Sequence, residues 1–206
     1  MRMDLMDLRR FDAVAVRASA DLVAGVTAAD LARPTPCGEW DLGALLAHMT
    51  AQHRGFAAAA AGRGADLAVW RPAPLGDDPA GAYAAAASAV IAAFAPDDVL
   101  DRAFVLPEFG SDQPFPGRLA VSFHLVDYVV HGWDVAVARG VGFSLPDEVL
   151  QATLAVARQV PDDEGRLAPG APFAPGRPVP DGAGALDEIV GLLGRDPSLL
   201  PGRGPA

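Results

Sequence analysis

Apolar residues recur at intervals of three and four along four long stretches of this chain, namely residues 4–26, 42–61, 79–95 and 118–138. The first stretch carries the repeat on Leu8, Phe11, Ala15, Ala18 and Leu22. This spacing places the apolar side chains on one face of an α-helix, and that face must pack against other helices to be shielded from water. Four such stretches predict a mainly all-α fold built as a four-helix bundle.

Helix-capping residues and a change of pattern mark where these helices end. Asp41 suits the N-cap of the second helix, because its side chain can accept a hydrogen bond from the first turn. Gly140 suits the end of the fourth helix. Between these helices, Ala103-Phe-Val-Leu106 followed by Phe109-Gly110 lacks the helical period and predicts a short strand or hairpin.

The last third of the chain has a different composition. A fifth helix is predicted over residues 146–160, and residues 161–181 are dense in Pro, Gly and Ala, which is typical of irregular structure. A short helix follows, carried by Leu186, Ile189, Val190 and Leu193. We therefore expect residues 1–160 to form the helical bundle and residues 161–206 to be an extension packed on the same domain. The 51% hydrophobic content is sufficient for one sizeable core.

Charge excludes two classes of partner. The net charge of −10 repels a phosphate backbone and an anionic membrane surface, so we expect no nucleic acid and no membrane partner. All sixteen basic residues are arginine, which excludes Schiff-base chemistry on lysine. Small molecules are the expected partners. The sequence does not fix the oligomeric state, and a homodimer is compatible with it.

The compartment is predicted from cysteine usage and the absence of targeting segments. Cys37 is the only cysteine, so no internal disulfide can form. The first ten residues mix charged and apolar side chains and lack the long apolar run of a signal peptide. The longest uncharged stretch, residues 79–96, is shorter than the roughly 20 residues of a membrane span. We expect a cytoplasmic protein.

A polar strip on the fourth helix is the main candidate for chemistry. It contains His124, Asp127, His131 and Asp134, which are spaced so that they share one helix face. Two imidazoles and a carboxylate are ligands that zinc and similar divalent ions accept, but one helix seldom completes a site. The alternative is that these side chains are simply solvated.

A further ligand for this strip must come from elsewhere in the chain, and the other two histidines both lie on the second predicted helix. His48 lies to one side of the apolar stripe of that helix, whereas His53 lies inside the stripe. On the fourth helix, Asp127 and His131 likewise lie beside a stripe formed by Leu119, Phe123, Val126, Val130, Trp133 and Val137. His48 is therefore the better geometric match for a metal ligand. His53 is more simply a core-edge histidine satisfied by a hydrogen bond.

Two motifs carry a family resemblance. Thr35-Pro-Cys-Gly-Glu-Trp-Asp41 with Leu45-Leu-Ala-His48 resembles the first motif of the mycothiol-dependent maleylpyruvate isomerase N-terminal-domain family. Asp127-Tyr-Val-Val-His-Gly-Trp-Asp134 resembles its second motif. The family belongs to the DinB-like four-helix bundle superfamily, and the resemblance covers residues 8–138. The ending around residues 191–197 is similar to that of a shorter subgroup known as metal-binding proteins.

The resemblance implies a ligand set for a divalent metal. The metal, usually zinc, would be held by His48, Asp127 and His131. The isomerase that gives the family its title carries glutamate at the acidic position, so the shorter Asp127 leaves Ni²⁺, Fe²⁺ and Co²⁺ open as alternatives. His124 and Asp134 are candidates to orient the ligands from a second shell, although capping and solvation are equally ordinary roles.

Three functions are compatible with a three-ligand site. With an open metal position, a low-molecular-weight thiol such as mycothiol would lose its proton and attack an electrophilic small molecule, which gives thiol transfer or isomerisation. With water in that position, the chain would be a hydrolase or cyclase of a biosynthetic pathway. With a fourth protein ligand such as His124, it would be a non-catalytic metal- or ligand-binding protein. From its length we expect the chain to lack the additional C-terminal domain of the full isomerase.

Four further residues receive structural interpretations. Trp40 and Trp133 are expected in the core, on the basis of their positions beside and within apolar stripes. Cys37 is expected to pack in a turn, with no neighbouring histidine to activate it. Arg195 is expected to favour the dipole at a helix C-terminus over a substrate carboxylate.

Overall fold

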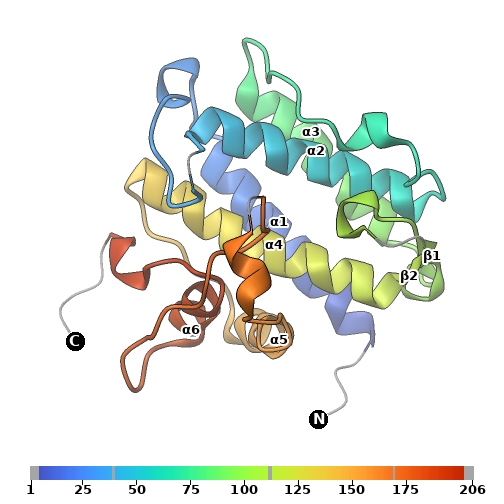
Figure 1. Ribbon diagram of the computed structural model, residues 1–206. Coiled ribbons are helices and arrows are strands. Elements are labelled where there is room, and N and C mark those ends of the chain that lie inside the picture. The colour runs from blue at the N-terminus through green and yellow to red at the C-terminus, as the bar shows by residue number, and fades with distance from the viewer. Residues whose placement is uncertain (1–4, 39, 111–112, 169, 202–206) are drawn as a thin grey trace.

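Four long helices form the bundle that the periodicity predicted. The computed structural model describes residues 5–38, 40–110, 113–168 and 170–201. The bundle helices are α1 (Leu5–Val23), α2 (Leu42–Ala60), α3 (Pro79–Phe94) and α4 (Gly117–Arg139) (Figure 1). Asp4, the expected first residue of the first helix, and Glu39 of the first motif lie outside the described residues. The all-α prediction is confirmed.

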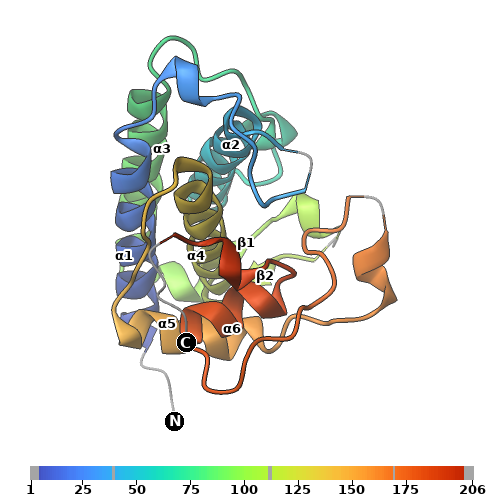
Figure 2. The same cartoon turned by 90° about the vertical axis from the view of Figure 1, so that its left-hand side faces the viewer.

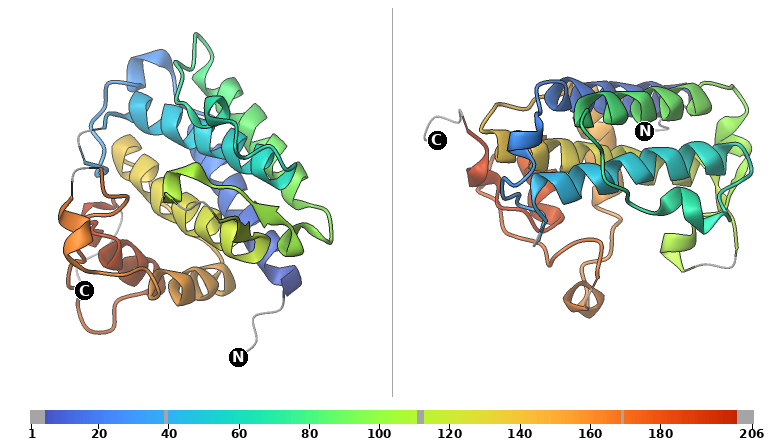
Figure 3. Two further views of the ribbon diagram at one scale, coloured as in Figure 1. Left: turned by 45° about the vertical axis from the view of Figure 1, so that its right-hand side comes forward. Right: turned by 90° about the horizontal axis from the view of Figure 1, so that it is seen from above.

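The bundle has two layers. Seen from above in Figure 3, α1 and α3 form one layer, and α2 and α4 form the other. Helix α1 packs against α4 and α3, and α2 packs mainly against α3. Among the neighbouring helix pairs of the four-helix bundle, α2 and α4 pack least closely. Polar side chains, among them His48 and Asp127, come together between these two helices.

The helix ends follow from local side-chain chemistry. Asp41 is the N-cap of α2, and its carboxylate accepts a hydrogen bond from the Ala44 N–H at 2.8 Å, as expected. Asp78 caps α3 in the same way through the Gly81 N–H, with Pro79 in the first turn. Gly140 ends α4 with φ +67°, a left-handed conformation that glycine adopts without strain.

Helix α4 is buried on more sides than its predicted stripe allowed. Leu119 is 39% exposed and Phe123 only half-buried, although both were assigned to the apolar stripe. In contrast, Leu125, Tyr128 and Val129 are fully buried. The reason is that α4 contacts α1, α2, α5 and α6, so its buried surface is much wider than one stripe.

The segment between α3 and α4 carries short elements only, in the part of it that the structure describes. It contains the 3-10 turns η3 (Val99–Asp101) and η4 (Pro107–Phe109) and two short antiparallel strands, β1 (Ala103–Phe104) and β2 (Phe115–Pro116). The predicted strand is therefore present, but it pairs with residues beyond the expected turn at Phe109-Gly110. Two further 3-10 turns, η1 (Ala28–Asp30) and η2 (Leu67–Trp70), lie in the other bundle loops.

The C-terminal segment packs on the bundle. Helix α5 (Asp147–Ala157) contacts α4 and α1, and α6 (Ala185–Leu192) contacts α5 and α4 (Figure 2). Between these helices, the described residues are irregular apart from η5 (Glu164–Leu167). A further turn, η6 (Pro197–Leu199), follows α6. None of the described helices is long and apolar enough to span a bilayer.

Candidate metal centre

His48, Asp127 and His131 come together between α2 and α4. One donor atom from each of the three residues lies within 4.8 Å of the other two. Nε2 of His131 is 3.3 Å from a carboxylate oxygen of Asp127, one helical turn earlier. The imidazole rings of His48 and His131 meet edge to face, with centroids 5.4 Å apart. The structure thus brings together the three residues that the resemblance proposed as metal ligands.

The donor set suits zinc. In a tetrahedral site, bonds of about 2.0–2.1 Å separate two donor atoms by about 3.3 Å, which matches the separation between Asp127 and His131. The side chain of His131 is 6% exposed, and that of Asp127 is 25% exposed. A cation held here would be enclosed on the His131 side and reachable from solvent on the Asp127 side.

Burial and charge set the protonation states of the three residues. Burial lowers the pKa of His48 to about 4, and Asp127 opposes this only in part. Burial would also lower the pKa of His131, but the charge and hydrogen bond of Asp127 raise it well above its usual value. Burial would raise the pKa of Asp127, and His131 instead lowers it. The metal-free centre therefore pairs an imidazolium with a carboxylate where a cation would bind.

Behind His131 lies a buried network that includes Asp134. Nδ1 of His131 is 3.0 Å from Oδ2 of Asp134, which has no solvent exposure. A histidine that donates one ring N–H to a carboxylate presents its other nitrogen to a metal in a fixed orientation. Asp134 is thus in the orienting position that the sequence analysis considered for it.

Arg195 and Cys37 belong to the same network, and the expectation that Cys37 has no neighbouring histidine was wrong. Arg195 is 5% exposed and forms an ion pair with Asp134 at 3.0 Å. It also donates a hydrogen bond to the sulfur of Cys37 at 3.4 Å. Cys37 does have a neighbouring histidine, since its Sγ lies within 4.8 Å of donor atoms of His131 and Asp134. A turn near residue 37 and a helix end near residue 195 are distant in sequence, and only the packed fold brings them together.

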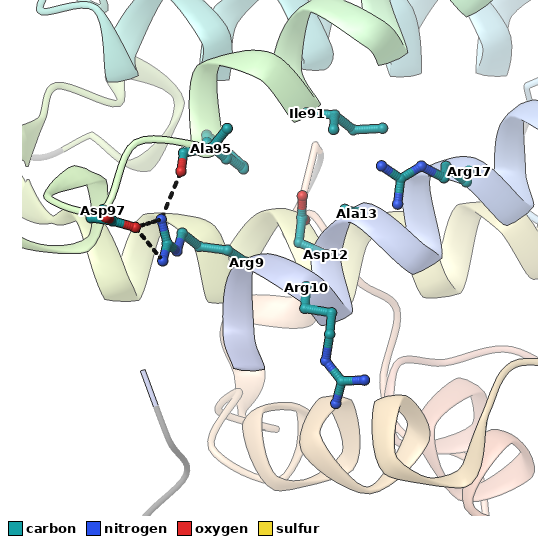
Figure 4. Close-up of a pocket in the computed structure, with 9 residues that line it drawn as sticks. Arg9, Arg10, Asp12, Ala13, Arg17, Ile91, Ala95 and Asp97 are labelled. Atoms are coloured by element: carbon teal, nitrogen blue, oxygen red, sulfur yellow. Dashed lines mark hydrogen bonds and ion pairs between the residues drawn. The ribbon is translucent and has the colours of Figure 1, made fainter. Parts of the chain in front are cut away.

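His124 pairs with residues other than the three candidate metal ligands. It shares a helix face with His131, but seven residues correspond to about 10 Å along the helix axis, which is too far for contact. Its Nδ1 instead pairs with Asp12 at 2.6 Å, and its Nε2 lies 3.3 Å from Nδ1 of His53. Asp12, the partner of His124, also lines a pocket of about 350 Å³ between α1 and α3. Figure 4 shows this pocket with the neighbouring Arg9 and Arg17. His124 and His131 thus share a face of α4, but their separation along the helix axis keeps the two side chains apart.

His53 is a core histidine, as its position in the stripe indicated. It is fully buried, shares a hydrogen bond with His124 and stacks on Tyr128 with ring centroids 3.9 Å apart. Its Nε2 has no hydrogen-bond partner among the described residues. Trp133 is also fully buried, as expected.

Trp40 lies beside the metal centre and not in the core. It is 39% exposed, and its indole lies 4.7 Å from the ring of His48, measured between centroids. Its position directly before the N-cap Asp41 places Trp40 near the start of α2, but part of its side chain stays accessible. Trp40 thus covers one side of a candidate ligand.

Glu108 and Gln52 were missed by the sequence analysis. Gln52 lies one turn after His48 on α2 and donates a hydrogen bond of 2.6 Å to the carboxylate of Glu108 in η4. Partial burial raises the pKa of Glu108, and the negative charge of Asp127 raises it further. Because Glu108 lies in a segment without helical periodicity, no spacing signal pointed to it.

Comparison with known proteins identifies the family. The family model described as the mycothiol maleylpyruvate isomerase N-terminal domain matches residues 13–136, which include both motifs. Two uncharacterised proteins of Mycobacterium tuberculosis, from strains CDC 1551 / Oshkosh and ATCC 25618 / H37Rv, are each 33% identical over 184 residues. The alignments cover 86% of this chain and 92% of each relative. No solved structure gives a significant match. The chain belongs to the mycothiol maleylpyruvate isomerase N-terminal domain family.

Proposed function

We propose that this chain is a cytoplasmic, metal-dependent enzyme that activates a low-molecular-weight thiol, mycothiol, for reaction with an electrophilic small molecule. The observation that carries the proposal is the convergence of His48, Asp127 and His131, with exposure on the Asp127 side. The family description, which names mycothiol, supports the choice of thiol. Zinc is the metal that two imidazoles and a carboxylate favour.

The metal would supply one part of the chemistry. A divalent cation at this centre would favour the thiolate form of a bound thiol at neutral pH. In a transfer reaction, a sulfur electron pair forms the new S–C bond, and the leaving group departs with the pair of the bond that breaks. In an isomerisation, the sulfur adds to an activated double bond, the resulting single bond rotates, and loss of the thiolate restores the double bond.

The chain's own residues would orient the centre and move the proton. Asp134 holds Nδ1 of His131, so that Nε2 is directed at the cation position. Glu108 is the proposed acceptor of the thiol proton. Its carboxylate is held by Gln52, and its raised pKa lies closer to neutral pH than that of an ordinary glutamate. Trp40 shields one side of His48 from water.

The thiol reaction is favoured over a non-catalytic metal-binding protein. That alternative required a fourth protein ligand such as His124 to close the site. His124 is instead engaged by Asp12 and His53.

Metal analysis of purified variants tests the centre. We expect stoichiometric zinc in the wild type and loss of zinc in His48→Ala and His131→Ala. His53→Gln, which alters a histidine of α2 outside the centre, serves as the matched control and should retain zinc. Equal zinc content in the wild type and in His48→Ala would reject the centre.

Thiol consumption tests the activity. The zinc-loaded protein should accelerate the loss of free mycothiol in the presence of an alkyl halide or an activated alkene, and His48→Ala should not. Glu108→Gln should keep its zinc and lower the rate by about 10²–10⁴-fold, the usual contribution of a general base. A wild-type rate that does not depend on metal would count against the proposed function, whereas an unchanged rate in Glu108→Gln would remove only the role of Glu108.

A further inference from the structure

Two sets of possible metal donors overlap at His131. The first, here called the two-histidine set, consists of His48, Asp127 and His131. The second, here called the cysteine set, consists of Cys37, His131 and Asp134, whose donor atoms also lie within 4.8 Å of one another. Because both sets need the same imidazole, a divalent cation has two competing positions. Thiolate and imidazole together bind zinc well, so the cysteine set is a chemically credible competitor.

Arg195 places a positive charge inside the cysteine set. Its guanidinium makes two contacts with the carboxylate of Asp134, at 3.0 and 3.4 Å, and one with Sγ of Cys37 at 3.4 Å. Arg195 and Asp134 are 5% and 0% exposed, so solvent screens this charge weakly. A divalent cation would be repelled by the guanidinium and would find Asp134 and Cys37 already engaged.

The contacts of Arg195 also determine which nitrogen of His131 is available. Asp134 accepts from both Arg195 and Nδ1 of His131, and this fixes the imidazole with Nε2 facing Asp127. Arg195 in turn donates to the carbonyl of Leu193 at 2.8 Å, and its guanidinium lies 5.7 Å from the ring centroid of Phe173. Leu193 and Phe173, like Arg195 itself, belong to the C-terminal segment, outside the family match at 13–136.

We propose that Arg195 selects between the two donor sets: it occupies the cysteine set as an internal cation and directs His131 to the two-histidine set. This inference rests on the proposed metal centre and adds a selectivity residue to it. Arg195 acts through Asp134 and Cys37 and is a positioning residue. Its role makes the C-terminal segment part of the metal centre.

Cobalt(II) distinguishes the two sets by spectroscopy, since only a cysteine ligand gives a thiolate-to-cobalt charge-transfer band in the near ultraviolet. The wild type should bind cobalt without this band. Arg195→Met should show the band and should bind cobalt at the two-histidine set at least tenfold more weakly, the usual effect of losing an outer-shell partner. Arg195→Met with Cys37→Ser should lose the band. A charge-transfer band in the wild type, or none in Arg195→Met, would overturn the proposal.

Two further variants separate selection from general damage. Arg166 is a second buried arginine of the same segment, 9% exposed, and it donates to the carbonyls of Pro161, Ala174 and Leu192 without touching Asp134. Arg166→Met should lower thermal stability but leave the cobalt spectrum and affinity unchanged. Equal losses of affinity in Arg166→Met and Arg195→Met would mean that Arg195 is only structural.

Arg195→Lys covers the case in which Arg195→Met fails to fold. Lysine keeps the positive charge but loses the bidentate contact with Asp134. The affinity for cobalt should therefore fall less than in Arg195→Met, and a weak charge-transfer band should appear. A spectrum and affinity identical to the wild type would contradict selection by the guanidinium geometry. Failure of the proposed centre itself has a different signature, because His48→Ala would then bind cobalt as tightly as the wild type.

Discussion

Burial keeps both histidines of α2 uncharged, although their surroundings differ. His53 is fully buried in the core, and His48 is half-buried at the metal centre. Burial lowers the pKa of both residues, well below 6.5 for His53 and to about 4 for His48. Each side chain is therefore neutral in the folded chain at neutral pH, as a metal ligand and an apolar core both require.

This shift predicts a loss of stability in mild acid. The unfolded chain takes up a proton at His53 near pH 6.5, whereas the folded chain does so only at a much lower pH. Stability from His53 is thus complete above about pH 6.5 and is lost as the pH falls from there toward the folded pKa, by at most about 1.4 kcal/mol per pH unit. Urea denaturation of metal-free wild type and His53→Gln between pH 7 and 5 measures this. His53→Gln should show the flatter profile, and parallel profiles would contradict the shift.

Residues on regular helices could be predicted from the sequence, and residues in loops could not. The spacing within α4 put Asp127 and His131 on one face, and the stripe on α2 separated His48 from His53. The structure places these residues as that geometry implied. Glu108, Cys37 and Arg195 lie in a 3-10 turn, a loop and the chain after α6, where no period fixes direction. Their neighbours depend on tertiary packing alone.

The start of α2 is an element-scale determinant of the centre, because His48 lies in the second turn after the cap. Asp41→Ala removes the hydrogen bond to the Ala44 N–H and should lower the free energy of unfolding by about 1 kcal/mol. Asp41→Asn, which keeps an acceptor at the same position, should lose much less. Chemical denaturation of the three proteins checks this, and an equal loss in both variants would show that the charge of Asp41 matters more than its cap.

The packing of α2 against η2 predicts that a normally favourable substitution will be harmful. Gly55 lies within α2, and a Cβ atom there would approach ring atoms of Trp70 to 2.2 Å. Trp70 is held by a hydrogen bond of 2.8 Å from its Nε1 to the Gly64 carbonyl, so it cannot easily move. Gly55→Ala should therefore cost about 1–3 kcal/mol, despite a helix-propensity gain of about 1 kcal/mol.

A second helical glycine gives the control for this substitution. At Gly132 in α4, the nearest atom to an added Cβ would be the ring tip of the half-buried Phe143, at 3.0 Å. Phe143 can shift by the few tenths of an ångström required, so Gly132→Ala should cost clearly less than Gly55→Ala. Thermal or urea unfolding of both variants decides the point. A larger loss in Gly132→Ala would mean that Trp70 yields more easily than Phe143.

The positions of the helices along the chain were predicted more accurately than the faces that each helix buries. The helices appear where the periodicity placed them, because propensity, capping and apolar spacing agree there. The stripe assigned to α4 was too narrow, because the sequence of one helix does not reveal that four others pack around it. The short strand over Ala103–Phe104 pairs with Phe115–Pro116, a partner that the local sequence pattern did not identify.

At the scale of the whole molecule, the C-terminal segment joins the bundle through apolar packing and through the metal centre. Ile189 and Val190 of α6 are fully buried, and α6 contacts both α5 and α4. Arg195 compensates the charge of Asp134 inside the bundle. Removing one partner of such a buried pair typically costs about 3–5 kcal/mol, so the bundle depends on the segment as much as the segment depends on the bundle.

This mutual dependence predicts that residues 1–160 and 161–206 unfold together. Ile189→Ala should lower the free energy of unfolding by about 2–5 kcal/mol, because it leaves a cavity between α6 and its neighbours. If the chain is one cooperative unit, far-ultraviolet circular dichroism and tryptophan fluorescence should still report one coincident transition at a lower denaturant concentration. Trp133, fully buried in α4, reports the bundle side of that transition. An early transition seen by circular dichroism but not by fluorescence would instead mean that the C-terminal segment detaches first, in which case Arg195 would leave the metal centre before the bundle opens.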